Sequence, residues 1–325
     1  MAAKGQAAAV DGATGWIPRL NLRHLQLLVR LTELRSISDA ARAMSTTQPA
    51  LSKWLRELEE DIGAPLFERR IRGLEPTEHG QVLLLHARRA LNEMQRARDN
   101  LAALHGSRSR KVLLGSAPAS TTALVPLAIA RFLELHPQAQ VELCERTMSV
   151  LLQKLERGEL DVIVGSLDGL PPSDGVHSEL LHSEPLKIIA RAGHPLATRK
   201  RLAWDDLYAY GWVLWPRDTV NRSKLDAALA NAGRGPLPCR VESSSMLANM
   251  TLIERTDLLC AVSNRLARHF AERLQLVTLG FSLEVETPIG MCWREQPLQE
   301  ASTLDLLRSL RESAKLLRRK GANGR

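Results

Sequence analysis

Between Ser45 and Arg70 the sequence reads STTQPALSKWLRELEEDIGAPLFERR, and its polar residues gather where a helix should begin. A glutamine can form two hydrogen bonds with an adenine edge, a lysine can reach guanine, and threonine or proline carbons can contact a thymine methyl group. The predicted base-contacting residues are Thr47, Gln48, Pro49, Ser52 and Lys53. An ordinary capped and solvated helix start is the alternative.

Three arginines follow this helix, in a segment whose pattern predicts a small two-stranded wing around a glycine turn. They are Arg69, Arg70 and Arg72. Guanidinium groups suit backbone phosphates, and such contacts position a protein on DNA without specifying the base sequence. We therefore expect these arginines to supply affinity for DNA in general.

Hydroxyl groups mark a second place where a small ligand could bind. The segment GSAPASTT follows a predicted strand and should begin a helix, so its hydroxyl and free N–H groups suit a carboxylate or sulfonate. The expected ligand is a small organic anion or a polar, sugar-like molecule. The candidate contacts, from this segment and from other strand ends, are Ser116, Ser120, Thr121, Ser166, Thr219, Asn221 and Ser243. Each of them could instead be only a cap or a turn residue.

The base-contacting group requires a helix–turn–helix, which the apolar spacing predicts from about Ile37 to Arg56. Ser38 is expected to cap its first helix, and Ser36 and Ser38 are included among the predicted DNA contacts. Thr47 is expected to cap the second helix, because a proline two positions later is tolerated in a first turn. Gly63 should end that helix.

A long helix should follow, from Glu78 to about Leu104, with Thr77 as its cap. It has apolar residues at positions that suit a partner helix, including Val82, Leu85, Ala90, Leu91, Met94, Leu101 and Leu104. We favour pairing with a second chain over packing within the helix's own domain.

After the polar stretch HGSRSRK the pattern changes to strands that alternate with helices, in two successive series. This alternation predicts a parallel, helix-covered sheet, and two such series predict a bilobed α/β domain with a cleft. The predicted organisation is a disordered tail over 1–19, a DNA-binding domain over 20–77, a linker (dimerisation) helix over 78–105 and a ligand-binding domain over 110–315. Lobe I is placed at about 110–183 and 287–315, and lobe II at about 184–286.

The distribution of charged and apolar residues along the sequence limits the possible functions of the protein. The formal charge of +8 is concentrated at the ends: residues 1–105 hold 15 basic and 12 acidic residues, 106–307 hold 22 and 23, and 308–325 hold 7 and 1. A basic terminal domain beside a neutral one fits local contact with nucleic acid. The N-terminal stretch lacks the apolar core of a signal peptide, and the sequence has no apolar run long enough for a membrane helix. A cytoplasmic protein without a membrane partner is therefore expected.

Motifs for catalysis are missing from the sequence: it contains no HExxH, GxSxG, GxxxxGK[ST] or GxGxxG. We therefore expect no enzyme activity, no cofactor and no metal site. The four cysteines are far apart in sequence and are expected to be reduced, buried thiols, with a redox-sensing role as the alternative.

The segment SISDAARAMSTTQPALSKWLRELEEDIGAPLFERRIRGLEPTEHG resembles the N-terminal domain of the LysR-type transcriptional regulators, and the resemblance extends over about residues 20–315. The shared pattern consists of Ser36, Ala40-Ala41, Gln48-Pro49, Ser52, Leu58-Glu59, Gly63, Pro65-Leu66-Phe67, Arg69, Thr77 and Gly80. The resemblance implies a winged helix–turn–helix, a dimerising linker helix and a sensor domain like the periplasmic binding proteins. It also implies homotetramers on promoter DNA, a small-molecule effector and, as these proteins are usually activators, contact with RNA polymerase.

Two positions depart from the family's pattern. Trp54 replaces a residue that is commonly polar, and ERTDLLCAVS lacks a glycine-rich turn that many members have. These departures suggest a subgroup that resembles regulators of sugar or aromatic-compound metabolism. Two other functions stay open: an enzyme or solute-binding protein with an added N-terminal domain, and a constitutive architectural DNA-binding protein without an effector.

Overall fold

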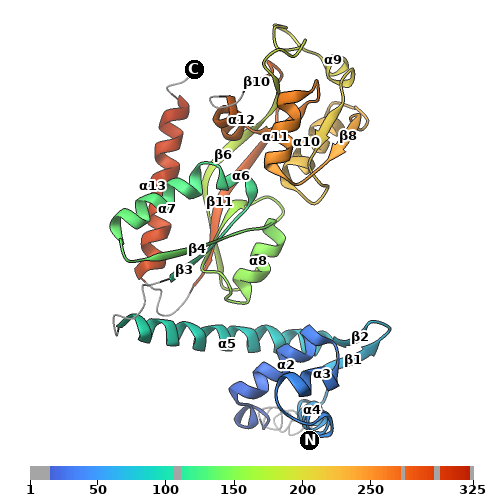
Figure 1. Cartoon of the computed structure of the whole chain (residues 1–325), viewed down its shortest axis with the longest axis vertical. Helices are drawn as coiled ribbons and strands as arrows, with labels where there is room; N and C mark the ends of the chain where they lie inside the picture. The colour runs from blue at the N-terminus through green and yellow to red at the C-terminus, as the bar shows by residue number, and fades with distance from the viewer. Residues whose placement is uncertain (1–14, 105–110, 272–274, 296–300, 323–325) are drawn as a thin grey trace, which may run out of the picture. The chain divides into compact units, whose positions relative to one another are not determined.

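The computed structural model describes residues 15–104, 111–271, 275–295 and 301–322, and these form two compact units (Figure 1). The first unit holds the N-terminal helices and a two-stranded wing, and the second is an α/β domain with a mixed sheet. The predicted combination of a winged helix–turn–helix, a long helix and an α/β domain is confirmed. Most of the predicted tail, residues 1–14, and the polar linker 105–110 lie outside the described residues.

The first unit is built from short helices around one small apolar core. Its elements are η2 (Ile17–Arg19), α2 (Leu22–Leu34), α3 (Ile37–Ala43), α4 (Gln48–Ile62), β1 (Phe67–Arg70), β2 (Gly73–Pro76) and α5 (Glu78–Leu104). Leu31, Leu51 and Leu66 from three different segments are fully buried in the core. The leucines of α4 therefore fix which side of this helix faces outward.

Partly buried hydrogen bonds connect the wing to helix α4. The Glu59 carboxylate accepts hydrogen bonds from the backbone N–H groups of Leu66 and Phe67, at 2.7 and 3.1 Å. Gly80 allows α5 to begin directly against this segment, because a Cβ there would collide with the carbonyl oxygen of Leu66. The orientation of the wing thus depends on residues outside the wing itself.

Two sequence-based expectations for this unit are wrong in detail. Helix α3 begins at Ile37 and its cap is Ser36, whose hydroxyl accepts the Asp39 N–H at 3.3 Å, so Ser38 lies inside the helix. The helix begins earlier because Ile37 packs against the core as its first residue. The stretch 17–19, predicted as part of a disordered tail, forms the η2 turn, and Arg19 pairs with Asp61 at 2.7 Å.

The strands of the second unit are β3 (Lys111–Ser116), β4 (Gln140–Glu145), β5 (Val162–Ser166), β6 (Val176–Arg191), β7 (Trp212–Leu214), β8 (Cys239–Glu242), β9 (Cys260–Ser263), β10 (Leu276–Thr278) and β11 (Glu286–Arg294). Seven of them form a mixed sheet with the order β10-β6-β11-β5-β3-β4, with β9 paired to β6, and β7 and β8 form a separate parallel pair. Its helices are α6 (Pro118–Thr121), α7 (Leu124–Leu135), α8 (Met148–Glu156), α9 (Trp204–Tyr208), α10 (Val220–Asn231), α11 (Met246–Arg255), α12 (Asn264–Ala271) and α13 (Ala301–Ala322).

Separate apolar cores divide this unit into two halves. Strands β3 to β5 pack with α7, α8 and α13, and we call this half lobe I. Strands β7 to β10 pack with α9 to α12, and we call this half lobe II. Strands β6 and β11 run side by side through both halves, as Figure 1 shows.

The paired strands β6 and β11 correct the expected parallel sheet and show how the two lobes are connected. The sheet is not all parallel, because β11 runs antiparallel to both β5 and β6. The predicted lobe limits at 183/184 and 286/287 fall inside or at the start of these continuous strands, so the lobes are joined by regular strands rather than by loops. The exact limits of the lobes stay a prediction.

The cysteines are all unpaired. Cys239 is exposed, Cys144 is half-buried, and Cys260 and Cys292 are buried. Burial raises the pKa of the Cys260 thiol to about 12 and that of Cys292 to about 11, so both stay protonated at neutral pH. Because the thiolate is the reactive form, a redox role gains no support from these two residues.

Candidate DNA-binding and ligand-binding sites

The start of α4 presents polar side chains to solvent. Thr47 is the cap, and its hydroxyl accepts the Ala50 N–H at 3.4 Å, while Gly63 ends the helix in the left-handed conformation, as predicted. Gln48 is exposed, with its Nε2 atom 3.5 Å from the Ser52 hydroxyl. Lys53 is also exposed and lies 3.7 Å from Glu57. These side chains can reach a partner without unfolding the helix.

The other predicted contacts surround this helix start. Pro49 is exposed in the first turn of α4, Ser38 is exposed on α3, and Ser36 is partly occupied by capping α3. The Trp54 ring faces inward instead: it stacks on His24, with ring centroids 4.8 Å apart, and packs against the domain core. The departure at Trp54 therefore concerns packing within the domain, whereas base contact by the other residues stays a prediction.

The wing carries its three arginines on the exposed side. Arg69 and Arg72 are exposed, and Arg70 is bound to Glu68 through two hydrogen bonds of 2.5 and 2.9 Å. The hydrogen bond to Glu68 raises the pKa of the Arg70 guanidinium, followed by the charge of the same carboxylate. Arg70 would have to give up this partner to bind a phosphate, so Arg69 and Arg72 are the stronger candidates for phosphate contacts.

Helix α5 leaves apolar side chains in solvent along part of its length. Met94 and Leu101 are 52% and 59% exposed and lie one heptad apart, on the same face of the helix. Leu91 is half-buried, and the side chain of Leu104 lies outside the described part of the chain. Exposed apolar residues at heptad spacing are typical of a helix that pairs with another helix.

A cavity of about 310 Å³ lies between the two lobes of the second unit. It is small for a ligand cavity, near the lower end of the usual range of about 300–1,000 Å³. Its polar lining consists of Thr147, Ser149, Ser166, Asp168, Asp218, Thr219, Asn221, Ser244 and Thr287. Its apolar lining includes Ala119, Met148, Leu170, Trp215, Met246 and Ile289.

Three of the seven predicted ligand contacts line this cavity: Ser166, Thr219 and Asn221. The other four do not. Ser116 and Ser120 are buried, with 0% and 3% exposure, and Ser243 accepts a hydrogen bond from the Ser245 N–H. The Thr121 hydroxyl lies 2.7 Å from both the Pro118 carbonyl and the Glu145 carboxylate, either of which can accept its hydrogen. Ser244, the next residue, lines the cavity instead.

In the segment GSAPASTT the helix begins earlier than expected. Pro118 is the first residue of the short helix α6, and Ala117, Pro118 and Ala119 face the cavity. Ser120 and Thr121 fall at the end of this helix, and α7 begins separately at Leu124. Proline favours a helix start because its missing N–H would have no partner there.

Three longer helices begin at the wall of the cavity. Residues at the starts of α8, α10 and α11 line it, among them Met148, Val220 and Met246. Thr219 caps α10 without a side-chain hydrogen bond to the helix. The first N–H groups of a helix have no partner within it, and the helix dipole adds partial positive charge. The cavity can therefore bind ligand oxygen atoms without a basic side chain.

The charged side chains that line the described part of the cavity are acidic. Asp168 and Asp218 line it, whereas its described lining contains no lysine or arginine. Asp168, in the loop after β5, pairs at 2.6 Å with Lys224 of α10, so this ion pair joins lobe I to lobe II. Asp218 is exposed and can accept hydrogen bonds from hydroxyl groups of a ligand.

Several lining residues were missed from the sequence, including Thr147, Asp218 and Thr287. Thr147 and Asp218 each precede a helix that follows a strand, so the strand-end argument that found Ser166 could have found them. Thr287 had no such signal, because it lies in β11, and only the pairing of this strand brings it to the cavity. Within the described residues, no group of His, Cys, Asp or Glu could hold a metal ion. The described helices are all too short or too polar to cross a membrane.

Comparison with known proteins gives matches over both units. Residues 22–81 match the model "Bacterial regulatory helix-turn-helix protein, lysR family", and residues 105–315 match "LysR substrate binding domain". The chain is 32% identical over 283 residues to the HTH-type transcriptional regulator GbpR of Azospirillum brasilense, with 86% of this chain and 83% of that protein covered. It is 34% identical over 296 residues to the HTH-type transcriptional regulator GalR of Pseudomonas putida, with coverage of 89% and 73%.

Solved structures show the same fold. The crystal structure of CbnR, a LysR family transcriptional regulator, matches with a TM-score of 0.62 at 20% identity and covers 91% of this chain and 99% of that one. Full-length CbnR in complex with its target DNA matches with a TM-score of 0.63 at 21% identity, over 90% of this chain and all of that one.

Proposed function

Because the chain belongs to the LysR family of bacterial transcriptional regulators, we propose that α4 reads promoter DNA and that a ligand in the interlobe cavity controls the outcome. The observation that supports this most is the exposed start of α4, with Gln48, Ser52 and Lys53 on one accessible surface. In a helix–turn–helix, this turn is the part that contacts base edges in the major groove. The protein would work in the cytoplasm, where promoter DNA is found, and as an activator it would contact RNA polymerase.

The proposed effector is a small carboxylate that also carries hydroxyl groups. Helix starts at α8, α10 and α11 offer N–H groups to a carboxylate, and the lining hydroxyls and Asn221 can bind further oxygen atoms. Asp218 favours a ligand that donates hydrogen bonds over one that is only an acceptor. A carboxylate with hydroxyl groups combines the features of the two ligands expected from the sequence, an organic anion and a sugar-like molecule.

A thermal-shift series on the full chain tests this ligand class. We expect gluconate or galacturonate to stabilise the protein more than glucose, which lacks the carboxylate, and more than hexanoate, which lacks the hydroxyl groups. At a ligand concentration of 100 times Kd the gain is about 2.7 kcal/mol, or roughly 5–10 °C at about 2–4 °C per kcal/mol for a domain of this size. Stabilisation by hexanoate alone, or by glucose alone, would contradict the proposed class.

We also propose that two chains associate through α5 to form a dimer, and that these dimers assemble into tetramers. Leu101→Lys should lower the molecular mass measured by light scattering, because a charge would be buried in an apolar helix pair. Gln81→Lys adds the same charge to an exposed polar position of the same helix and serves as the control. If both variants keep the mass of the unchanged protein, α5 does not hold the chains together at Leu101.

A further inference from the structure

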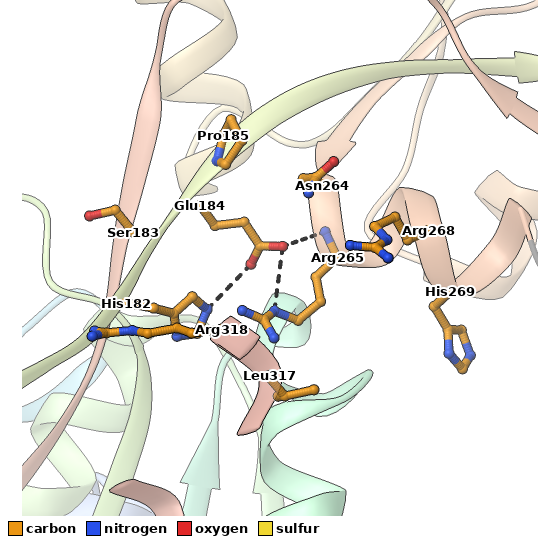
Figure 2. Close-up of a pocket in the computed structure, with 10 residues that line it drawn as sticks. All are labelled: His182, Ser183, Glu184, Pro185, Asn264, Arg265, Arg268, His269, Leu317 and Arg318. Carbon is orange, nitrogen blue, oxygen red and sulfur yellow. Dashed lines mark hydrogen bonds and ion pairs between the residues drawn. The ribbon is translucent and has the colours of Figure 1, made fainter. Parts of the chain in front are cut away.

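A second cavity in the ligand-binding unit, of about 500 Å³, lies beside β6 on the side of α12 and α13 (Figure 2). Its lining is rich in nitrogen atoms, from His182, Arg265, Arg268, His269 and Arg318, and it contains a single carboxylate, Glu184. The two cavities share no lining residue. Glu184 and His182 of β6 are register partners of Thr287 and Ile289 of β11, which line the interlobe cavity. The same pair of strands therefore borders both cavities.

Two side chains at this cavity, His182 and Arg265, have buried nitrogen atoms that make no hydrogen bond to a described residue. His182 is only 4% exposed, and neither of its ring nitrogens makes a hydrogen bond to a described residue. Its Nε2 atom lies 3.5 Å from Glu184. The Nε atom of Arg265 is also buried without a hydrogen bond, 3.7 Å from Glu184. Buried polar groups in folded proteins nearly always have partners, and here Glu184 is the acidic group nearest to both nitrogen atoms.

Glu184 is already engaged and cannot satisfy the surrounding positive charges. Figure 2 shows it in the middle of the group, between His182 and Arg265. It accepts the backbone N–H of Arg265, at the start of α12, and it is itself only 5% exposed. The three arginines and one glutamate alone contribute a formal charge of +2 around the cavity.

Two neighbouring arginines disfavour the charged form of Arg265. Burial lowers the pKa of the Arg265 guanidinium, and the charges of Arg268 and Arg318 lower it further, although Glu184 acts in the opposite direction. Arg318 donates a hydrogen bond to the Leu181 carbonyl, which holds α13 close to β6. A small anion with two negative charges would pair with the guanidinium groups of Arg265, Arg268 and Arg318 and reduce the repulsion between them.

We propose that this cavity is a second ligand site, separate from the interlobe cavity, for a small dianion such as a phosphate group or a dicarboxylate. The site is formed by His182, Arg265, Arg268 and Arg318. The cavity is lined by α12 of lobe II and α13 of lobe I, so a bound anion would contact both lobes. Arginine is suited to both kinds of dianion, because its planar fork forms paired hydrogen bonds with phosphate and with carboxylate oxygens.

Isothermal titration of the full chain with inorganic phosphate and with succinate, at low ionic strength, tests the proposal and distinguishes the two sources of negative charge. We expect saturable binding of at least one of them with one site per chain, and no binding of glycerol. Arg265→Gln and Arg268→Gln should each weaken binding at least tenfold. Arg255→Gln removes the same charge from an exposed position outside the cavity lining and should change the affinity less than twofold.

Ala119→Phe, which fills the interlobe cavity, should leave this binding unchanged, so the second site is tested independently of the proposed effector site. Absence of saturable binding by both anions overturns the proposal. So does an equal loss in the Arg255→Gln and Arg265→Gln variants, because this would show an effect of overall charge rather than of the cavity.

Discussion

Replacing Gln48 with alanine should weaken binding to the operator by about 1–3 kcal/mol, or roughly 5- to 150-fold, and should relax the base preference at one position. Gln48 is exposed at the start of α4, and its contact within the chain is the 3.5 Å approach to Ser52, so the substitution removes no buried interaction. The measurement is fluorescence anisotropy with a series of duplexes, each carrying a single base-pair change.

Arg69→Ala is the matched comparison, because this side chain is also exposed but lies on the wing. It should weaken specific and random duplexes alike, and it should reduce the slope of log affinity against log salt by about 0.9 for one lost phosphate contact. Should Gln48→Ala also lower the affinity for every duplex by the same factor, the assignment of base recognition to Gln48 is wrong.

Ala119→Phe should abolish the response to the effector and should lower effector affinity by about 100-fold or more, equal to about 2.7 kcal/mol. Ala119 is a half-buried lining residue of a cavity of only about 310 Å³, so a phenyl ring there competes directly with a ligand. The substitution removes no polar contact. DNA binding without effector should stay normal, because α4 belongs to the other compact unit.

Ala248→Phe is the control for this variant, because Ala248 is exposed on α11 and does not line the cavity. Reporter transcription and effector titration, measured on both variants, give the outcome. Normal induction of the Ala119→Phe protein would place the effector outside the interlobe cavity.

The sequence was most informative where local chemistry decides the structure. The cap at Thr47, the stop at Gly63 and the apolar stripe of α4 all depend on residues within a few positions of one another, and each was predicted correctly. The wing and the long helix α5 follow the same logic. Ser38 shows the limit of such reasoning: two serines could cap α3, and only the packing of Ile37 against a distant core selects Ser36.

The lining of the interlobe cavity was predicted less well because tertiary pairing creates it. Ser166, Thr219 and Asn221 were found since strand ends and helix starts meet in α/β domains. Thr287 reaches the cavity only because β11 returns antiparallel to β6, which no local pattern indicates. Likewise, the burial of Ser120 and the orphan nitrogens of His182 depend on neighbours far away in sequence.

The central claim is that this chain recognises a DNA sequence through α4 and changes that interaction when a ligand occupies the interlobe cavity. Footprinting on the DNA that flanks its own gene, with and without the compound that stabilises the protein most, tests both parts in one measurement. We predict protection of a defined site that Gln48→Ala weakens, and a change in the protected region when the ligand is added. Protection no stronger than on random DNA, or an identical footprint with and without the ligand, would contradict the account.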